Sequence, residues 1–486
     1  MKRNYSIAKI SFIGFYILLI ALYIIFAAAF RNDNFYRMCV ISTIFIFISV
    51  LVILFFKRRI IDFGNILYII FILFQFGLPI LKAFNKDFYN YYLTEFTEEN
   101  LIICTYISCL CILFYGFGLL IFSKHNENFL YFSRDQIKYK IISDSNKSNI
   151  ISIMIIVGFF TGIVSFSLAL ANFVLSLIYG YEYIKTDPFN LTNSLTNFCN
   201  ELFIPCILIL LIFSNSKKIR KIVFLIGIVY SILLILSGAR TYSIGLLATL
   251  ALFIYIYKMK KNVFKTLMFL LFGLLLIIVV VRVAQIRHYH EVQNLSIFSI
   301  FESLINEMGF NFTSICFTRL YVPNISDYAF GMSYLNSFIC LIPKSLDPSG
   351  FINYVNGLLP EIWLSNMLKT TFGTKYDFGV GFSVIAEGYY NFGFFAFVPI
   401  FLQSLLINWI FSRRINIKYK NFSIYIKLIL FYSLFTYPRR SFITLLKSLE
   451  YNILLVFVII ILMNAIVKSI HEKSTERNYL LWIKFF

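Results

Sequence analysis

The chain has 486 residues, of which 60% are hydrophobic, 19% aromatic and only 14% charged. A soluble protein of this length could not cover so much apolar surface with so few charges. The net charge of +20 would suit a nucleic-acid partner, but the basic residues fall in short clusters between apolar runs. That pattern is typical of a polytopic membrane protein. We therefore expect an all-α, multi-pass membrane protein with no nucleic-acid partner.

Apolar runs long enough to cross a hydrocarbon layer of roughly 30 Å recur along the whole sequence. Further runs follow the first one, 10–30, so we interpret it as an anchor and not as a cleaved signal peptide. The pattern predicts one membrane domain over 1–486 with about twelve transmembrane helices. The predicted spans are 10–30, 38–56, 63–81, 101–122, 149–179, 197–213, 222–236, 241–257, 264–283, 379–411, 421–436 and 442–469.

The basic clusters between the spans indicate the orientation. KRR at 57–59, KKIRK at 217–221 and SRRINIKYK at 412–420 fall on the same predicted side as both chain ends. Lysine and arginine are enriched in cytoplasmic loops, so the pattern predicts cytoplasmic termini. We interpret the positive charge as a topology signal.

The longest segment predicted on the outer side runs from about 284 to 378. Unstructured loops of such length are uncommon and usually functional. FESLINEMGFNFTSICF has helical spacing of its apolar residues, and YLNSFICLIP is nearly a span in itself. We expect one large extracytoplasmic loop containing amphipathic or re-entrant helices that lie against the outer membrane face.

The cysteines and histidines give no sign of a metal site. Eight cysteines show no CxxC pair, and most lie in predicted spans, where cysteine behaves as a small apolar residue. His288 and His290 form a His-x-His pair, but no third ligand has a suitable spacing. We predict no disulfide framework, no metal and no cofactor.

Arginines on the predicted outer side are unexpected, because lysine and arginine are enriched in cytoplasmic loops. Each of them therefore calls for an explanation. Arg240 closes the turn of SGARTYS (237–243) and directly precedes a predicted helix, which Thr241 or Ser243 could cap. In YPRRS (437–441), Pro438 could open a helix beside Arg439 and Arg440. Free N–H groups at a helix start and a guanidinium together suit an anion such as phosphate.

A third basic cluster, RVAQIRHYH at 282–290, leaves the ninth predicted span. On a continuing helix, Arg287, His288 and His290 crowd one region near the outer surface. The alternative for every arginine is a span-end side chain that reaches the lipid headgroups, as we expect for Arg31 and Arg37. For the histidines the alternative is a packed or water-facing position.

Placing an acidic side chain inside a membrane span costs free energy, so such residues are candidates for a functional site. Glu387, in GFSVIAEGYYNFGFF, is the clearest, with Tyr390 and Asn391 beside it. It is a candidate general base, and the alternative is a buried partner for an outer arginine. Glu201, near the outer end of the sixth span, is a weaker case of the same kind.

Aromatic residues mostly serve lipid contact and the interface belts. Some outer tyrosines are nevertheless candidates for stacking on sugar rings. They are Tyr289, Tyr321, Tyr334 and Tyr390.

Three stretches resemble the O-antigen polysaccharide polymerases, the Wzy-type enzymes of bacterial surface glycan assembly. They are GFSVIAEGYYNFGFFAF at 381–397, the loop piece from EMGFNF to LIP within 307–343, and SGAR at 237–240, a looser form of an SGSR-like turn. The resemblance implies a glycosyltransferase type-C-like fold in the bacterial inner (plasma) membrane. It also implies polymerisation of undecaprenyl-pyrophosphate-linked repeat units into O-antigen or capsular polysaccharide at the periplasmic face, as part of lipopolysaccharide biosynthesis.

The implied reaction assigns roles to the candidate residues. Fixed cations stabilise the charge of a leaving lipid diphosphate. The implied diphosphate-binding residues are Arg240, Arg282, Arg287, Arg319, Arg439 and Arg440. Glu387, His288 or His290 would assist the acceptor hydroxyl, and Tyr334, Tyr390 and Asn391 would bind sugar. The expected partners are the lipid-linked oligosaccharides, membrane lipids and a polysaccharide chain-length regulator.

Two other functions compete with this interpretation. A lipid-linked oligosaccharide flippase would show two similar halves and charges near the middle of the membrane, whereas the unusual charges here gather at the outer ends of spans. An O-antigen ligase shares the fold type and the donor but uses a lipid A core as acceptor. The stretch at 381–391 favours the polymerase over the ligase.

Overall fold

The computed structural model describes residues 2–30, 33–57, 62–122, 144–179, 194–257, 297–342, 347, 349–373, 381–412, 420–463 and 465. These residues form helices and connecting turns and contain no strand. Nine of the helices in this part of the chain are long and apolar enough to cross a membrane. The prediction of an all-α, multi-pass membrane protein is therefore confirmed.

The predicted count of twelve spans stays a prediction. The span at 241–257 appears as the shorter apolar helix Thr241–Tyr255, and the one at 421–436 as the 17-residue helix α18 (Lys420–Thr436). The span at 264–283 lies outside the described residues.

The chain divides into two compact units. Unit 1 comprises Met1–Phe129, Glu291–Arg414 and Leu434–Leu446, and unit 2 comprises Leu130–His290, Ile415–Ser433 and Lys447–Phe486. We describe each unit by itself. The single membrane domain over 1–486 stays a prediction.

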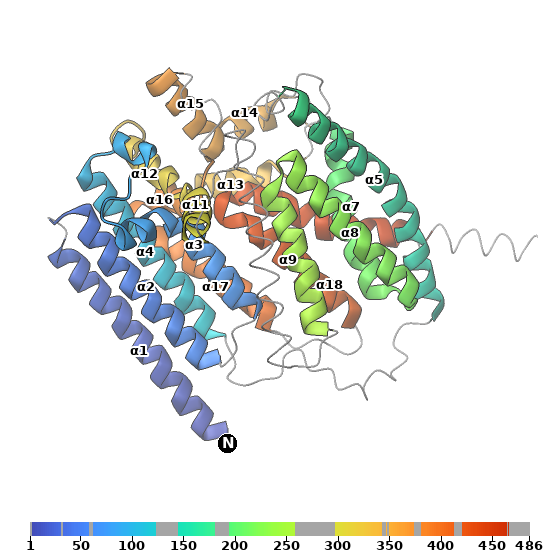
Figure 1. Cartoon of the computed structure of the whole chain (residues 1–486), viewed down its shortest axis with the longest axis horizontal. Helices are drawn as coiled ribbons and strands as arrows, with labels where there is room; N and C mark the ends of the chain where they lie inside the picture. Colours follow the sequence, from blue (N-terminus) through green and yellow to red (C-terminus); the bar gives the residue numbers. More distant parts are fainter. Residues whose placement is uncertain are drawn as a thin grey trace, which may run out of the picture. The chain divides into compact units, whose positions relative to one another are not determined.

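The spans of unit 1 pack around one central helix. They are α1 (Lys2–Ala29), α2 (Phe35–Lys57), α3 (Phe63–Phe84), α4 (Glu98–Ile121) and α17 (Phe397–Ser412). In Figure 1 α1, α2 and α4 lie side by side, and each contacts the other two. The most apolar stretch of α4 is 83% buried, against 28% for that of α1. A helix that is apolar on all sides belongs inside the packing, so α4 is the centre of unit 1.

The segment 284–378 contributes five helices to the described part of unit 1. They are α11 (Ile297–Gly309), α12 (Phe312–Tyr321), α13 (Met332–Ile339), α14 (Phe351–Gly357) and α15 (Pro360–Phe372). The α11 helix crosses α3 so closely that a Cβ on Gly77 would lie 2.7 Å from the Gly309 Cα. The α12 helix contacts α3, α4, α15 and α16 (Val384–Phe392) and is buried from Phe312 to Thr318. It lies inside the helix packing and not on its surface.

Unit 2 is built from the remaining spans. They are α5 (Asp144–Tyr179), α7 (Ser194–Phe213), α8 (Lys217–Ser237), α9 (Arg240–Tyr257) and most of α18. The α5 helix packs against α7 and α8, and α8 packs against α9. Tyr230 of α8 fits among Phe166 of α5 and Phe203 of α7, with ring centroids 5.3 and 5.0 Å away. Unit 2 also includes the π-helix η8 (Glu450–Leu455), which packs against α7.

Candidate functional site

A buried polar network in unit 1 is centred on Glu387 of α16. The side chain is 0% exposed. Its Oε1 accepts a hydrogen bond from the Ser333 hydroxyl at 2.9 Å, and its Oε2 accepts one from the Phe442 backbone N–H at 2.6 Å. Both carboxylate oxygens are therefore bonded to groups inside the protein, and neither of these partners is an arginine.

The second of these contacts places a carboxylate at a helix start. Phe442 is the first residue of α19 (Phe442–Leu449), which continues through η8 as one candidate span to Met463. A negative charge beside the free N–H groups of a helix start is favourable. The protein itself thus supplies a hydrogen-bond acceptor at the start of the helix that follows YPRRS.

Asn391 extends the network by one helical turn. Its Oδ1 accepts from the backbone N–H groups of Gly331 and Ser333, and its Nδ2 donates to Ser333 Oγ at 2.7 Å and to the Glu387 carbonyl at 2.8 Å. Gly331 precedes α13 with φ of 89°, a left-handed conformation that favours glycine. Asn391 therefore fixes the start of α13 against α16. It was predicted to bind sugar, and here its amide is engaged within the protein.

A cavity of about 770 Å³ lies next to this network, and we call it the loop cavity. Its volume is within the range of roughly 300–1,000 Å³ found for ligand sites. Ser333 lines the cavity and also donates to Glu387, so it joins the network to the cavity wall. The other polar and aromatic residues in its described lining are Asp327, Tyr328, Phe330, Asn336, Trp363, Asn366, Thr370 and Tyr390.

Two aromatic rings form part of the wall of the loop cavity. The ring centroids of Trp363 and Tyr390 are 4.6 Å apart, with 41° between the ring planes. Tyr390 was predicted as a sugar-stacking residue, and it lines a cavity. Trp363 and Asp327 were missed, although Asp327 lies within the 307–343 piece that carries the resemblance.

Tyr334, another predicted sugar-stacking residue, is packed inside unit 1. Its ring stacks on Phe392 at 6.4 Å and meets Phe442 edge-on at 5.3 Å. Burial raises the pKa of the Tyr334 hydroxyl well above its usual value, and the nearby Glu387 carboxylate adds to the rise. Tyr334 belongs to the aromatic packing around the network and does not line the loop cavity.

The arginines of unit 1 occupy different surroundings. Arg319, in the last turn of α12, is partly buried. The α12 helix packs against α16, which carries Tyr390 of the cavity wall. Arg439 is exposed and Arg440 is partly buried.

The backbone around Arg439 and Arg440 is held in place by its neighbours. Pro438 lies in the short 3-10 helix η7 (Tyr437–Arg439), and its carbonyl accepts from the Gln75 amide. Tyr437 donates to Gln403 at 2.9 Å, and Ser441 donates to Glu361 at 2.5 Å. The predicted helix after YPRRS exists, but it begins at Phe442 and not at Pro438.

The SGARTYS turn lies in unit 2 and joins two apolar helices, as predicted. Gly238 ends α8 with φ of 98°, and its N–H donates to the Ile235 carbonyl, a common way for glycine to terminate a helix. The α9 helix begins at Arg240, whose side chain lies outside the described part of the structure. Ser243 does not cap α9, because its hydroxyl donates to the Ser231 carbonyl of α8 at 2.6 Å.

Five predicted site residues lie outside the described residues. They are Arg282, Arg287, His288, Tyr289 and His290. Among the residues that the structure does describe, no group of three His, Cys, Asp or Glu side chains could hold a metal ion.

Comparisons with known proteins identify the family. Curated proteins and solved structures gave no match. The family model of the O-antigen polysaccharide polymerase Wzy matches residues 10–469, nearly the whole chain. The match includes both units, the Glu387 network, the loop cavity and the SGARTYS turn. The chain therefore belongs to the O-antigen polysaccharide polymerase Wzy family.

Proposed function

We propose that this protein joins undecaprenyl-pyrophosphate-linked oligosaccharide repeat units into O-antigen or capsular polysaccharide at the periplasmic face of the bacterial inner membrane. Membership of the Wzy family gives repeat-unit polymerisation in general terms. The observation that carries the proposal further is the loop cavity, an aromatic and polar cavity of about 770 Å³. It lies in the segment that the charge bias assigns to the outside.

The lining of the loop cavity suits an oligosaccharide. Trp363 and Tyr390 offer large rigid apolar faces for the carbon framework of a sugar. Asp327, Asn336 and Asn366 offer hydrogen-bond acceptors and amide donors for hydroxyl groups. We assign sugar binding to Tyr390 and Trp363, and no longer to Tyr334 and Asn391, because these two are engaged inside the protein.

The donor leaves as a lipid diphosphate, so cationic groups should surround that leaving group. Guanidinium groups bind phosphate in a bidentate fashion and, held in place, stabilise developing charge. Arg319 lies on α12, which packs against α16, the helix that carries Tyr390 of the cavity wall. The other proposed diphosphate contacts are Arg240, Arg282, Arg287, Arg439 and Arg440.

Glu387 is better suited to positioning than to proton transfer. A general base must reach the hydroxyl that it deprotonates, whereas Glu387 is 0% exposed and both its oxygens accept from internal donors. We propose that it positions Ser333 and the start of α19. His288 or His290 then remains the proposed proton acceptor.

The experiment is a chromosomal deletion complemented with parent or variant genes, followed by gel analysis of the surface polysaccharide. We expect Trp363→Ala and Arg319→Gln to reduce long chains about tenfold or more, because each removes a substrate contact worth on the order of 1–2 kcal/mol. The matched controls are Trp409→Ala, in the span α17, and Arg37→Gln, an exposed arginine paired with Asp33 at 2.8 Å. Both controls should keep the parent ladder.

The deletion strain separates the competing functions. Lipid A core capped by a single repeat unit indicates lost polymerisation and supports the proposal. Accumulated polymer that is not attached to lipid A core indicates a ligase, and absence of repeat units outside the cell indicates a flippase. Either of the last two results would overturn the proposal.

A further inference from the structure

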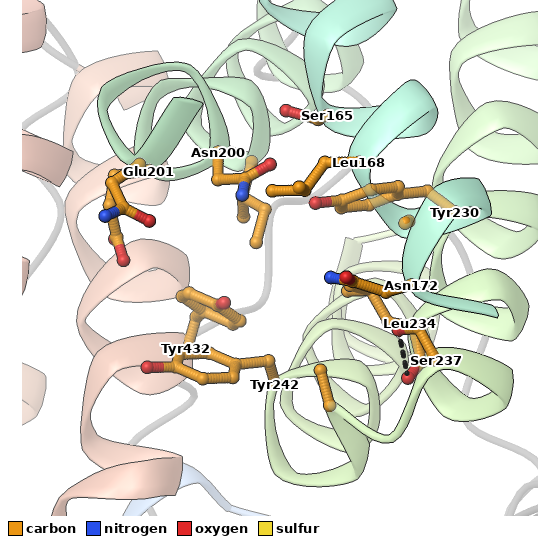
Figure 2. A pocket seen from close by; sticks show the side chains of 14 residues that line it. Ser165, Leu168, Asn172, Asn200, Glu201, Tyr230, Leu234, Ser237, Tyr242 and Tyr432 are labelled. Atoms are coloured by element: carbon orange, nitrogen blue, oxygen red, sulfur yellow. Dashed lines mark hydrogen bonds between the residues drawn. The ribbon is translucent and has the colours of Figure 1, made fainter. Parts of the chain in front are cut away.

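A second cavity, which we call the polar cavity, lies within unit 2 and has a volume of about 230 Å³. Residues from α5, α7, α8, α9 and α18 line it. Figure 2 shows Asn172, Asn200 and Tyr242 around the same space. Ser237 and Ala239 also line it, so the cavity borders the backbone of the SGARTYS turn.

Two polar atoms in this lining have no hydrogen-bond partner among the described residues. They are Ser165 Oγ and Asn200 Oδ1, and both atoms are buried. Ser165 is 0% exposed. Buried polar groups are nearly always hydrogen-bonded to protein or to ordered water. Their unmet capacity, facing a cavity, therefore points to a ligand with hydrogen-bonding groups.

The described charge in the lining is unfavourable for an anionic ligand. The described lining residues include the carboxylate of Glu201 but no lysine or arginine. This carboxylate would repel a diphosphate at close range. The described lining therefore favours a neutral occupant, in contrast to the leaving group proposed for the arginines.

The other side chains in the lining indicate the size of the ligand and the groups that it carries. Asn172, Asn197 and Asn200 offer both donors and acceptors, and Glu201 accepts from hydroxyl groups. Tyr230, Tyr242 and Tyr432 add apolar ring faces with polar tips. A volume below the roughly 300 Å³ of drug-sized sites fits a single small ring and not an oligosaccharide.

We propose that the polar cavity binds one neutral sugar ring through Ser165, Asn200 and Glu201. The sugar's identity as a residue of the repeat unit rests on the proposed function, whereas the binding of a neutral sugar does not. A ring held here lies next to the backbone at Arg240, one of the proposed diphosphate contacts.

The binding test uses full-length protein in lipid nanodiscs. The probe is the repeat-unit oligosaccharide released from the surface polysaccharide of the host strain, titrated by calorimetry. All proteins carry Trp363→Ala, so that binding at the loop cavity does not mask the result. Ala169→Phe fills the cavity, since Ala169 lines it and is 4% exposed. Leu170→Phe adds a similar ring at the next residue of α5, which is 47% exposed, and serves as the matched control.

We expect Ala169→Phe and Asn200→Leu to weaken oligosaccharide binding about tenfold or more, and Leu170→Phe to leave it unchanged. Asn200→Leu tests whether weaker binding comes from misfolding. It removes a buried polar atom that has no hydrogen-bond partner among the described residues, so it should not lower the apparent melting temperature. Equal binding by all variants, or no binding by the Trp363→Ala reference, would overturn the inference.

The complemented deletion strain, without Trp363→Ala, separates the inference from the proposed function. If the parent gene restores polymer and Ala169→Phe restores it equally well, the sugar site is wrong and the polymerase stands. If the parent gene fails to restore polymer but the titration still depends on Ala169 and Asn200, the polymerase is wrong and the sugar site stands. Loss of polymer with Ala169→Phe, but not with Leu170→Phe, supports both.

Discussion

The Glu387 network and the polar cavity use buried polar groups in opposite ways. Glu387 and Ser165 are each 0% exposed. Both oxygens of Glu387 accept hydrogen bonds within the protein, whereas the Ser165 hydroxyl has no partner among the described residues. A fully satisfied buried network makes a structure rigid and specific, but an unsatisfied one leaves capacity for a ligand. Burial of a polar residue in this family member therefore does not by itself indicate catalysis.

The satisfied network connects parts of unit 1 that are distant in the sequence. Ser333 is 54 residues before Glu387, and Phe442 is 55 residues after it. Through these contacts Glu387 links the starts of α13 and α19 to α16. The network can thus hold the wall of the loop cavity in place without touching the substrate.

The largest effect should come from Glu387→Ala. The change leaves the Ser333 hydroxyl and the Phe442 N–H without their acceptor, and an unsatisfied buried donor costs about 1–3 kcal/mol. We expect a total loss of stability on the order of 3 kcal/mol, measured as a lower apparent melting temperature in detergent and lower abundance in membranes. Glu99→Ala, at an exposed position in the first turn of α4, is the control and should change little. Full abundance and stability of Glu387→Ala without activity would instead favour a direct catalytic role.

A pair of serine substitutions tests the comparison directly. Ser333 is 1% exposed and Ser165 is 0% exposed, so alanine removes a buried hydroxyl in both cases. Ser333→Ala should cost about 1–2 kcal/mol because Glu387 and Asn391 lose a partner. Ser165→Ala should cost less stability than Ser333→Ala, because the Ser165 hydroxyl oxygen has no hydrogen-bond partner at close range among the described residues, yet it should weaken sugar binding. The measurement is the apparent melting temperature of each variant relative to the parent. Equal decreases for Ser333→Ala and Ser165→Ala would contradict the difference between the two buried hydroxyls.

The smallest effect is expected at Asp347, a partly exposed carboxylate whose hydrogen bonds resemble those of Glu387. Asp347 accepts from the Ser349 hydroxyl at 2.5 Å and from the Ile352 N–H, in the first turn of α14, at 2.6 Å. These hydrogen bonds, the one from Ser349 first, lower the pKa of Asp347 below its usual value. The stability that they contribute is therefore present above the pKa of the unfolded chain, about 3.9, and is lost as the pH falls through the lowered folded value.

The measurement is the difference in apparent melting temperature between the parent and Asp347→Asn from pH 7 to pH 3. We expect a small difference at pH 7 that narrows as the pH falls, because protonation removes the carboxylate that the variant lacks. A difference that widens toward pH 3 would mean that the aspartate acts in its protonated form.

Several features of the fold could be predicted from local sequence alone. The spans of both units could be recognised because a membrane-crossing helix needs a continuous apolar run of fixed minimum length. The turn at Gly238 could also be recognised, since a glycine between two apolar helices satisfies a backbone requirement within a few residues. The SGAR, 307–343 and 381–397 stretches pointed to the family that the whole chain then matched.

The candidate site was predictable only in part. Glu387 was recognised as buried because a carboxylate within an apolar run is rare. Its partners, Ser333 and Phe442, could not be predicted, since one contributes an ordinary hydroxyl and the other a backbone N–H. Trp363 and Asn200 were missed for a similar reason, because nothing in their local sequence distinguishes a cavity-lining residue from a surface one.

The sequence by itself determined that this protein crosses a membrane many times and which family it belongs to. These properties depend on the composition of single segments and on short motifs. Only the tertiary structure decided which buried polar groups are satisfied and which face a cavity. That decision depends on contacts between helices far apart in the chain, such as α13 with α16 and α5 with α7, and no local pattern carries the geometry of such contacts.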